Sequence, residues 1–566
     1  MKMILEQQIR SVLEGLQGAG TLPVFELPKI SVERPKEEQF GEYSSNVALV
    51  FAKQAKKSPM ELAETIESGI KNYESPTPPQ SSPRAGEDVK FLEKVDVVKP
   101  GYINFYLSQK ALGNVVEEIL IKKEQYGSSE IGKGVKVNNE FISANPTGPL
   151  HLGNARGGFY ADVLSRVLRK AGFAVTNEYY INDAGEQILK LGHSVLKDSE
   201  AVYGGEYIEE LRNQLFEIKN QKSKIKIDDF SVKEVGEKAA GIVMEEMIKK
   251  TLQEKMQVSF DVFISEQKDI VEKGYIDKAL EVLRAQENLV YEDGGALWLR
   301  TTLYGDDKDR VLIKQDGVKT YLASDCGYIL HKMERVHPDG GQGFERIIEI
   351  WGSDHHGYMG RFKAAAQALG FTGKVDFILV QLVKVVKDGE EVRMSKRAGN
   401  VVTIDELIEE VGHDVARFFF LLYAPETQMN FDLGLAEERS QKNPVFYVQY
   451  AHARLASILR KAEEEGFAKM SGDLNLLVHP KERELIRELL FFPELVETIA
   501  RDFTVHRLPQ YAIRLADKLH SFYADCRVLD GENKELSLAR LELIRAVKIV
   551  LAEMLHVMGI AASEKM

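Results

Sequence analysis

A turn rich in proline and glycine, residues 143–154, carries side chains suited to chemistry on phosphate. Its prolines stiffen the turn, and Gly153 lets the backbone approach a ligand closely. Helical apolar spacing follows at 155–171, so free N–H groups and the positive end of a helix dipole would lie where the turn ends. His151 and Asn154 can donate hydrogen bonds to phosphate oxygens that gain negative charge. The turn therefore predicts a phosphate site, although two residues that only cap a helix would give the same pattern.

A second cluster of charge lies far downstream, at residues 392–400. Arg393, Lys396 and Arg397 stand close together, and Gly399 gives the segment a flexible end. A flexible cationic loop can close over a polyphosphate and stabilise charge that develops there. A solvated turn would have the same composition, so the segment gains meaning only together with the first turn.

The order of elements around the first turn is typical of a nucleotide-binding α/β domain. Residues 135–143 predict a strand that leads into the turn and helix, a unit that opens many parallel-sheet domains. Strand-like segments resume at 297–303 and 347–351, after a charged helical stretch. We interpret that stretch, residues 186–286, as an insertion in a Rossmann-type domain that spans residues 136–435.

Two further regions flank this domain. Residues 1–110 predict a small α+β unit with a first helix at 3–18 and a strand at 101–107. The prolines and small polar residues of 74–88 predict a mobile surface loop. Helical periodicity dominates from 436 to 566, which predicts an all-α bundle.

Composition narrows the class of protein. The 566 residues are 44% hydrophobic and 28% charged, and no apolar run is long enough for a membrane span or a signal peptide. Cys326 and Cys526 stand far apart and offer neither a disulfide framework nor a zinc cluster, which favours a reducing cytoplasm. The net charge of −13 bears on solubility and does not exclude a local surface for nucleic acid.

The two segments, in this order, resemble the paired signatures of class I aminoacyl-tRNA synthetases. In the first, Asn154 stands where a second histidine is common, so that position keeps a hydrogen-bond donor and loses a titratable group. In the second, Lys396 matches the most important lysine. The wider turn is similar to that of the arginyl-tRNA synthetase family, whose signature maps to Ala144, Asn145, Pro146, Thr147, Gly148, Pro149, Leu150, His151, Leu152, Gly153 and Asn154.

The resemblance implies a set of site residues. The catalytic residues would be His151, Asn154 and Lys396. The ATP-binding residues would be His151, Gly153, Asn154, His355, Met394, Ser395 and Lys396. A guanidinium is always charged and favours carboxylates, and the arginine-binding residues would be Glu140, Asn145, Tyr321, Asp325 and His355.

Other interpretations of these residues stay open. Tyr321 and Asp325 share one face only if their segment is helical. Taken singly, Asp325 also fits a helix cap and His355 a structural histidine. The adjacent His355 and His356 have no third ligand at a familiar spacing, so we predict no metal bound by the protein itself. The segment 180–187 also fits the family, and we assign it a structural role or a contact with the tRNA end.

The flanking regions resemble the RNA-binding parts of the same family. Residues 1–110 would be the additional N-terminal domain that contacts the tRNA elbow, residues 111–135 a linker, and residues 436–566 the anticodon-binding domain. There, Tyr447, Tyr450 and Arg454 fall on one helical face that could stack on and neutralise anticodon nucleotides. Packing against a neighbouring helix is the competing interpretation for the tyrosines.

The predicted function is that of an arginine–tRNA ligase. It would use ATP with Mg²⁺ to convert L-arginine to arginyl-adenylate, and then transfer the arginine to tRNA(Arg), working as a monomer in the cytoplasm. One alternative is a class I synthetase for another amino acid. Another is an inactive, synthetase-derived RNA-binding protein, against which the retention of His151, Gly153 and Lys396 argues.

Overall fold

The computed structural model describes residues 1–27, 29–72, 91–220, 230–335, 343–392, 402–467 and 471–566. The proline-rich loop at 74–88 and the cationic segment at 393–400 lie outside the described residues. The chain forms two compact units. Unit 1 comprises Met1–Tyr126, Arg454–Phe491 and Asp517–Val550, and unit 2 comprises Gly127–Ala453, Phe492–Ala516 and Leu551–Met566.

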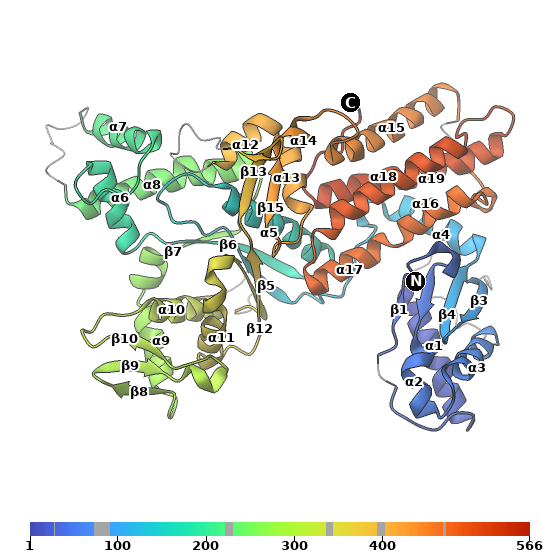
Figure 1. The fold of residues 1–566 in the computed structure, drawn as a ribbon, viewed down its shortest axis with the longest axis horizontal. Helices are drawn as coiled ribbons and strands as arrows, with labels where there is room; N and C mark the ends of the chain where they lie inside the picture. Colours follow the sequence, from blue (N-terminus) through green and yellow to red (C-terminus); the bar gives the residue numbers. More distant parts are fainter. Residues whose placement is uncertain (28, 73–90, 221–229, 336–342, 393–401, 468–470) are drawn as a thin grey trace. The chain divides into compact units, whose positions relative to one another are not determined.

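Unit 1 begins with the α+β fold expected from the sequence, drawn in blue in Figure 1. An antiparallel sheet of order β1-β2-β4-β3 comprises β1 (Val32–Glu33), β2 (Tyr43–Ser45), β3 (Leu92–Val98) and β4 (Tyr102–Leu107). Its helices are α1 (Lys2–Gly18), α2 (Val47–Ala55) and α3 (Pro59–Lys71), with the short turn η1 (Glu38–Phe40). Ile9, Phe51 and Phe105 are buried between them and form the core of this part.

The rest of unit 1 is helical. It contains α4 (Gln109–Lys122), η2 (Lys123–Gln125), η9 (Leu474–Leu476) and α16 (Pro480–Leu490). The buried carboxylate of Glu42 accepts hydrogen bonds from Leu107 N, at 2.6 Å, and from Arg487. Arg34 pairs with the buried Glu488 at 2.7 Å. Because a buried charge is costly without its partner, these pairs fix the first strands against α16 within unit 1.

Unit 2 is built on a five-stranded parallel sheet of order β12-β11-β5-β6-β7, which confirms the Rossmann-type prediction. The strands are β5 (Lys136–Glu140), β6 (Ala174–Ile181), β7 (Val262–Ser265), β11 (Arg346–Gly352) and β12 (Lys374–Val380). The chain runs from β5 outward to β7 on one side, and later adds β11 and β12 on the other. Sheets of this kind bind ligands outside the carboxyl ends of the strands, at the point where the order reverses, here between β5 and β11.

Helices connect β6 to β7, so the predicted insertion exists, but its limits differ. It contains α6 (Glu186–Leu196), α7 (Glu206–Asn220), α8 (Val232–Ile242) and the π-helical η4 (Val243–Ile248) and η5 (Thr251–Lys255). Helices α6 and α8 pack closely, because a Cβ at Gly192 or Gly236 would overlap main-chain oxygen of the other helix. The range 186–286 was too long. It includes β7, which is an edge strand of the parallel sheet.

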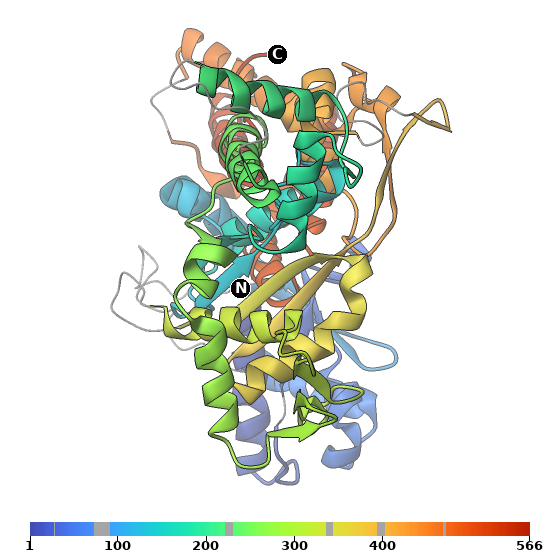
Figure 2. The same ribbon diagram turned by 90° about the vertical axis from the view of Figure 1, so that its left-hand side faces the viewer.

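The strand expected at 297–303 also belongs elsewhere. Residues Ala296–Leu299 form β9 of a separate antiparallel sheet with β8 (Val290–Asp293) and β10 (Arg310–Ile313), and Thr301–Tyr304 form the turn η7. This small sheet lies at the opposite end of unit 2 from the green insertion helices in both views (Figures 1 and 2). Around it lie η6 (Glu266–Val271), α9 (Tyr275–Arg284), α10 (Tyr321–Glu334), η8 (Ser353–Tyr358) and α11 (Met359–Ala368).

A third sheet, of order β14-β13-β15, comprises β13 (Val383–Lys387), β14 (Glu390–Glu391) and β15 (Met429–Asp432). The remaining helices are α5 (Leu152–Lys170), α12 (Ile404–Val411), α13 (His413–Leu421), α14 (Leu433–Glu437), α15 (Pro444–Glu464), α17 (Phe492–Asp502), α18 (Arg507–Asp525) and α19 (Lys534–Val557). The helical C-terminal region is as expected, and α15, α18 and α19 contribute residues to both units. Among the described helices, none combines the length and apolarity needed to cross a membrane.

Candidate active site

His151 caps the N-terminus of α5, and this role fixes its ring. Its Nδ1 accepts hydrogen bonds from Gly153 N at 3.1 Å and Asn154 N at 3.3 Å. Because Nδ1 acts as an acceptor, the neutral ring carries its proton on Nε2. Burial lowers the pKa of His151, which favours the neutral form. The ring therefore offers an Nε2–H donor beside the helix N-terminus.

Asn154 completes the same capping box. Its Oδ1 accepts a hydrogen bond from His151 N at 3.1 Å, which turns the amide oxygen toward the backbone. The Nδ2 group is then the part of the side chain that can donate to a ligand. Capping and phosphate binding, the two interpretations of this turn, are thus compatible. The cap uses the acceptor atoms, Nδ1 of His151 and Oδ1 of Asn154, and leaves the donor groups, Nε2–H and Nδ2, for a ligand.

The chain that follows the second cationic segment returns to this turn. Thr403 forms a β-bridge with His151, and Ile404 N donates to Leu150 O at 3.1 Å. On the other side of the segment, Val392 N donates to Val385 O of β13 at 2.9 Å. The predicted Met394, Ser395 and Lys396 lie outside the described residues, but the residues just after them are bonded to the first signature.

Arg156, which the sequence analysis did not single out, links the same two regions. Its side chain is fully buried on α5, and it donates to Gln381 O at 2.9 Å and Ala424 O at 2.8 Å. Gln381 precedes β13 and Ala424 precedes β15. One guanidinium therefore binds the chain just before two strands of the third sheet, the sheet whose strand β14 precedes the cationic segment in sequence. The sequence signal was an arginine within the first turn of α5, but its partners lie more than two hundred residues away.

Three buried carboxylates lie side by side on neighbouring strands of the parallel sheet, at the level where β5 ends. They are Glu140 of β5, Glu178 of β6 and Glu349 of β11. Lys332 of α10, itself fully buried, donates to Glu140 at 2.6 Å and to Glu349 at 2.7 Å. Tyr328 donates to Glu140 at 2.6 Å and also bonds Glu178. This network fixes the carboxylate of Glu140, a predicted arginine ligand, at the edge of the site.

The carboxyls of this network differ in how readily they ionise. Burial and the neighbouring Glu140 raise the pKa of Glu349 to about 8. Burial also opposes ionisation of Glu178, but Lys332 and Arg335 outweigh it and hold the pKa of Glu178 below its ordinary value. Two cations, Lys332 and Arg335, therefore favour the ionised form of Glu178, whereas burial and the charge of Glu140 oppose ionisation of Glu349.

Asp325 lies on α10 as expected, one helical turn after Tyr321. It accepts a hydrogen bond from Tyr358, and burial, with a contribution from Glu140, raises the pKa of Asp325 to about 6. Tyr321 is 76% exposed at the first position of the helix. The segment 321–328 is helical, which meets the condition for Tyr321 and Asp325 to share one face. The cap interpretation of Asp325 is wrong, because Asp325 lies inside the helix.

Glu266 is a further acidic residue near Asp325, and the sequence analysis missed it. It directly follows β7, hydrogen-bonds with Tyr180, and lies close enough to Asp325 to sense its charge. Burial, and after it the charges of Asp325 and Asp183, raise the pKa of Glu266 to about 7. A carboxylate just after a strand was the available signal, but β7 was not recognised as a strand.

The other predicted ligands lie on the same edge of the sheet but are more exposed. Asn145 is exposed in the turn after β5, where its main-chain carbonyl accepts a hydrogen bond from Thr147 N at 2.7 Å. His355 is exposed in η8, just after β11, with its ring 6.0 Å from that of Trp351. The order of β5 and β11 in the sheet places both next to the switch point. Neither is within hydrogen-bond contact of Asp325 among the described contacts.

The predicted anticodon-contact residues all lie on α15. Tyr447 and Tyr450 are half-buried in unit 2, and Arg454, in unit 1, stacks over the ring of Tyr523 at 4.2 Å. The helix they need is confirmed, whereas their contact with tRNA stays a prediction.

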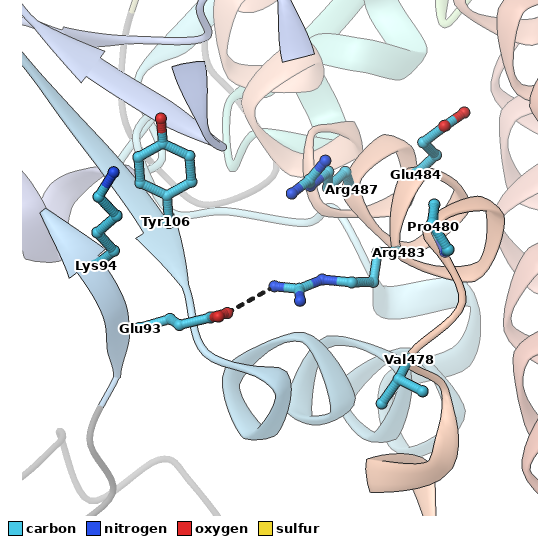
Figure 3. A pocket seen from close by; sticks show the side chains of 8 residues that line it. All are labelled: Glu93, Lys94, Tyr106, Val478, Pro480, Arg483, Glu484 and Arg487. Atoms are coloured by element: carbon cyan, nitrogen blue, oxygen red, sulfur yellow. Dashed lines mark hydrogen bonds and ion pairs between the residues drawn. The ribbon is translucent and has the colours of Figure 1, made fainter. Parts of the chain in front are cut away.

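Unit 1 also contains a cavity of about 340 Å³ between β3, β4 and α16 (Figure 3). Tyr106 and Lys94 line it from the sheet, and Arg483 and Arg487 line it from the helix. Arg483 pairs with Glu93 at 2.9 Å, and Arg487 pairs with Glu42. Its arginines thus serve to join the sheet to the helix.

Three known families together match most of the chain. Residues 3–107 match the arginyl tRNA synthetase N terminal domain, residues 115–418 match the class I (R) tRNA synthetase catalytic domain, and residues 448–566 match the DALR anticodon binding domain. The parallel sheet, its capped first turn and the returning second segment agree with these matches. The chain is a class I aminoacyl-tRNA synthetase.

Full-length relatives narrow the assignment. A curated protein of Anoxybacillus flavithermus named arginine–tRNA ligase is 44% identical over 581 aligned residues, covering 100% of this chain and 99% of the relative. One of Bacillus subtilis with the same name is 42% identical over 586, with the same coverage. The solved arginyl-tRNA synthetase of Thermus thermophilus shares the fold, with a TM-score of 0.75 at 24% identity and full coverage of both chains. The chain belongs to the arginyl-tRNA synthetase family.

Proposed function

We propose that the chain activates L-arginine with ATP and esterifies tRNA(Arg) with it, through the residues described above. The observation that carries the choice of arginine is the pair Asp325 and Glu266, two neighbouring carboxyls with raised pKa, of which Asp325 also senses the charge of Glu140. Planar carboxylates in a partly desolvated pocket suit a guanidinium, which is always charged. Burial favours the protonated form of both acids, and a bound cation would lower both pKa values.

Adenylate formation needs positioning and charge stabilisation more than acid–base chemistry. The arginine carboxylate attacks the α-phosphorus of Mg²⁺-ATP in line, and pyrophosphate leaves. In our proposal, Nε2–H of His151, Nδ2 of Asn154 and the N-terminus of α5 donate to phosphate oxygens. Lys396 supplies positive charge to the leaving pyrophosphate, and Mg²⁺ is held by phosphates and water. The terminal ribose of tRNA then attacks the adenylate carbonyl.

The decisive test is ATP-dependent charging of total tRNA with each radiolabelled amino acid in turn. Charging with arginine alone supports the proposal. Charging with another amino acid would show a synthetase of different specificity, and binding of tRNA without charging would show an inactive RNA-binding protein. Size-exclusion chromatography of the same sample tests the further proposal that the chain is a monomer, and fractionation of cells tests its place in the cytoplasm.

The pH dependence of arginine binding should follow the two raised pKa values. Asp325 faces Tyr358, Glu140, Arg361 and Lys332, and Glu266 faces Tyr180, Asp325 and Asp183. The arginine cation favours the ionised carboxylates, so binding releases protons and affinity rises with pH. We expect KM for arginine to fall as pH rises from about 5.5 to about 7.5, and then to level off.

A thermal-shift titration gives a second view of the same groups. Both acids hold protons more tightly in the folded than in the unfolded chain, so their contribution to stability declines as pH rises from about 4 to about 7. Bound arginine should restore this lost stability. The increase in thermal midpoint that arginine causes should therefore be larger at pH 8 than at pH 5.5. Equal KM values and equal shifts at both pH values would show that these carboxyls do not bind the substrate cation.

Arginine activation should itself depend on tRNA, as the family resemblance implies. The segment after the cationic signature bonds to the first turn at Thr403 and leads through α12 into α13. There Arg417 donates to Met558 O of the C-terminal tail and pairs with Asp162 of α5. Binding of tRNA to the C-terminal domain could therefore bias the signature segment toward closure, a shift in population that needs only differential affinity.

ATP–pyrophosphate exchange measures this dependence directly. We expect exchange with arginine only when tRNA is present, and we expect tRNA with an oxidised 3′ ribose to support it equally, because no transfer is required. Full exchange without tRNA would contradict the dependence and leave the assignment to the family unchanged.

A further inference from the structure

The turn that carries Glu266 is held by a single carboxylate from the loop that follows β6. Ser265 Oγ donates to Asp183 Oδ2 at 2.6 Å, and Gln267 N donates to Asp183 Oδ1 at 2.9 Å. These two donors stand immediately before and immediately after Glu266. Each oxygen of Asp183 therefore fixes one side of the residue whose carboxylate enters the arginine pocket.

Other bonds of the same turn complete its fixation. Ser265 is buried, its Oγ accepts from Lys268 N at 3.0 Å, and its N donates to Asp269 at 2.9 Å. With the bond to Asp183, the hydroxyl both donates and accepts. The N–H and the hydroxyl of Ser265 thus both fix the first turn of η6, and Glu266 begins that turn.

Asp183 belongs to the segment 180–187, which the function has not otherwise used. It lies two residues after the end of β6, where Asp183 N donates to Ile181 O at 3.0 Å. Tyr180, the neighbouring member of this segment, hydrogen-bonds the side chain of Glu266. One short stretch of chain therefore contacts Glu266 through Tyr180 and holds its backbone through Asp183.

We propose that Asp183 is a positioning residue for arginine specificity, which aims Glu266 at the substrate guanidinium by holding Ser265 and Gln267. The proposal rests on the function proposed above. A carboxylate pairs well with a planar guanidinium only in a narrow geometry, so a small rotation of this turn weakens binding. Asp183 makes no contact with substrate in this role. Its whole effect passes through Glu266.

Two variants of the full-length protein, assayed with tRNA, test this. Asp183→Ala removes both bonds, and we expect KM for arginine to rise about tenfold to a hundredfold, as for other displacements of about 1 Å, with KM for ATP unchanged. Asp183→Asn keeps the shape and one acceptor, so the rise should be smaller. Asp183→Asn also removes a charge that raises the pKa of Glu266, so the fall of KM with pH should move to lower pH. That shift follows from the charge alone, so the positioning role is tested by the rise in KM for arginine at unchanged KM for ATP.

The double variant with Glu266→Gln separates positioning from general damage. If Asp183 acts only through Glu266, Asp183→Ala should change KM for arginine by less than about twofold in the Glu266→Gln background. Asp198→Asn is the matched control, because Asp198 holds a turn of the insertion by bonds to Glu200 N, at 2.9 Å, and His193, at 2.7 Å. It should leave KM for arginine unchanged.

The outcomes distinguish this proposal from the function it rests on. A strong effect of Glu266→Gln with no effect of Asp183→Ala overturns the positioning role and leaves the arginine site intact. Equal effects of Asp183→Ala in both backgrounds also overturn it. No effect of Glu266→Gln on KM for arginine would instead remove Glu266 from the proposed site, and with it the basis for Asp183.

Discussion

Replacing Asp325 with asparagine is expected to lower kcat/KM for arginine by about 30- to 5000-fold, which corresponds to roughly 2–5 kcal/mol. Asp325 is held by Tyr358, and a neutral amide would leave a desolvated guanidinium with one charged partner fewer. Since none of the contacts of Asp325 within the described residues reaches the turn at His151, KM for ATP should stay close to that of the wild type. The change is almost isosteric, so the helix should remain intact.

Steady-state aminoacylation with varied arginine and varied ATP gives both constants. Glu334→Gln is the matched control, because it removes a carboxylate from the same helix, where Glu334 forms an exposed pair with Lys278. It should behave as the wild type. If Asp325→Asn changes KM and kcat for arginine by less than about threefold, Asp325 is not the anchor, and Glu266 and Glu140 must hold the guanidinium without it.

The sequence was informative wherever a long element carried its own pattern. The strand before the first turn, α5 after it and the helix around Asp325 are all local features, and each occurs close to its expected place. Even the cap of α5 follows from residue types, because His151 and Asn154 are three residues apart, as a capping box requires.

The strand β7 and its neighbours show where this reasoning fails. β7 has only four residues and runs directly into the π-helical η6, so alternation cannot be recognised. Because β7 was not recognised, neither Glu266 nor the hydrogen bonds from its turn to Asp183 could be predicted. β9 looked like part of the main sheet because a strand pattern does not reveal which sheet it joins.

The buried charges depend on contacts that no local pattern encodes. Lys332 looks like a residue of a solvated helix, yet it is fully buried and bonded to Glu140 and Glu349. These contacts require the register of β5 against β11 and the packing of α10 across both. Arg156 is similar, since its partners Gln381 and Ala424 become neighbours only in the folded unit.

The second large effect is expected at His151, where two variants separate the cap from the chemistry. Asparagine is a favoured N-cap residue, so His151→Asn should keep the start of α5 and the thermal midpoint close to wild type. It removes the Nε2–H donor. Alanine removes both the donor and the cap, and should cost about 1 kcal/mol of stability in addition.

Both variants should lower kcat for adenylate formation by about 30- to 1000-fold, or roughly 2–4 kcal/mol, with little change in KM for arginine. The donor strengthens as negative charge builds on the phosphate, so its loss affects the transition state more than the ground state. Lys396→Ala carries the same expectation.

The control is Ser231→Ala, which removes the capping box that Ser231 and Glu234 form at α8. It should lower stability and leave kcat unchanged. Full kcat in His151→Asn would show that His151 serves the helix alone, whereas a raised KM for ATP at unchanged kcat would show that it only binds the nucleotide.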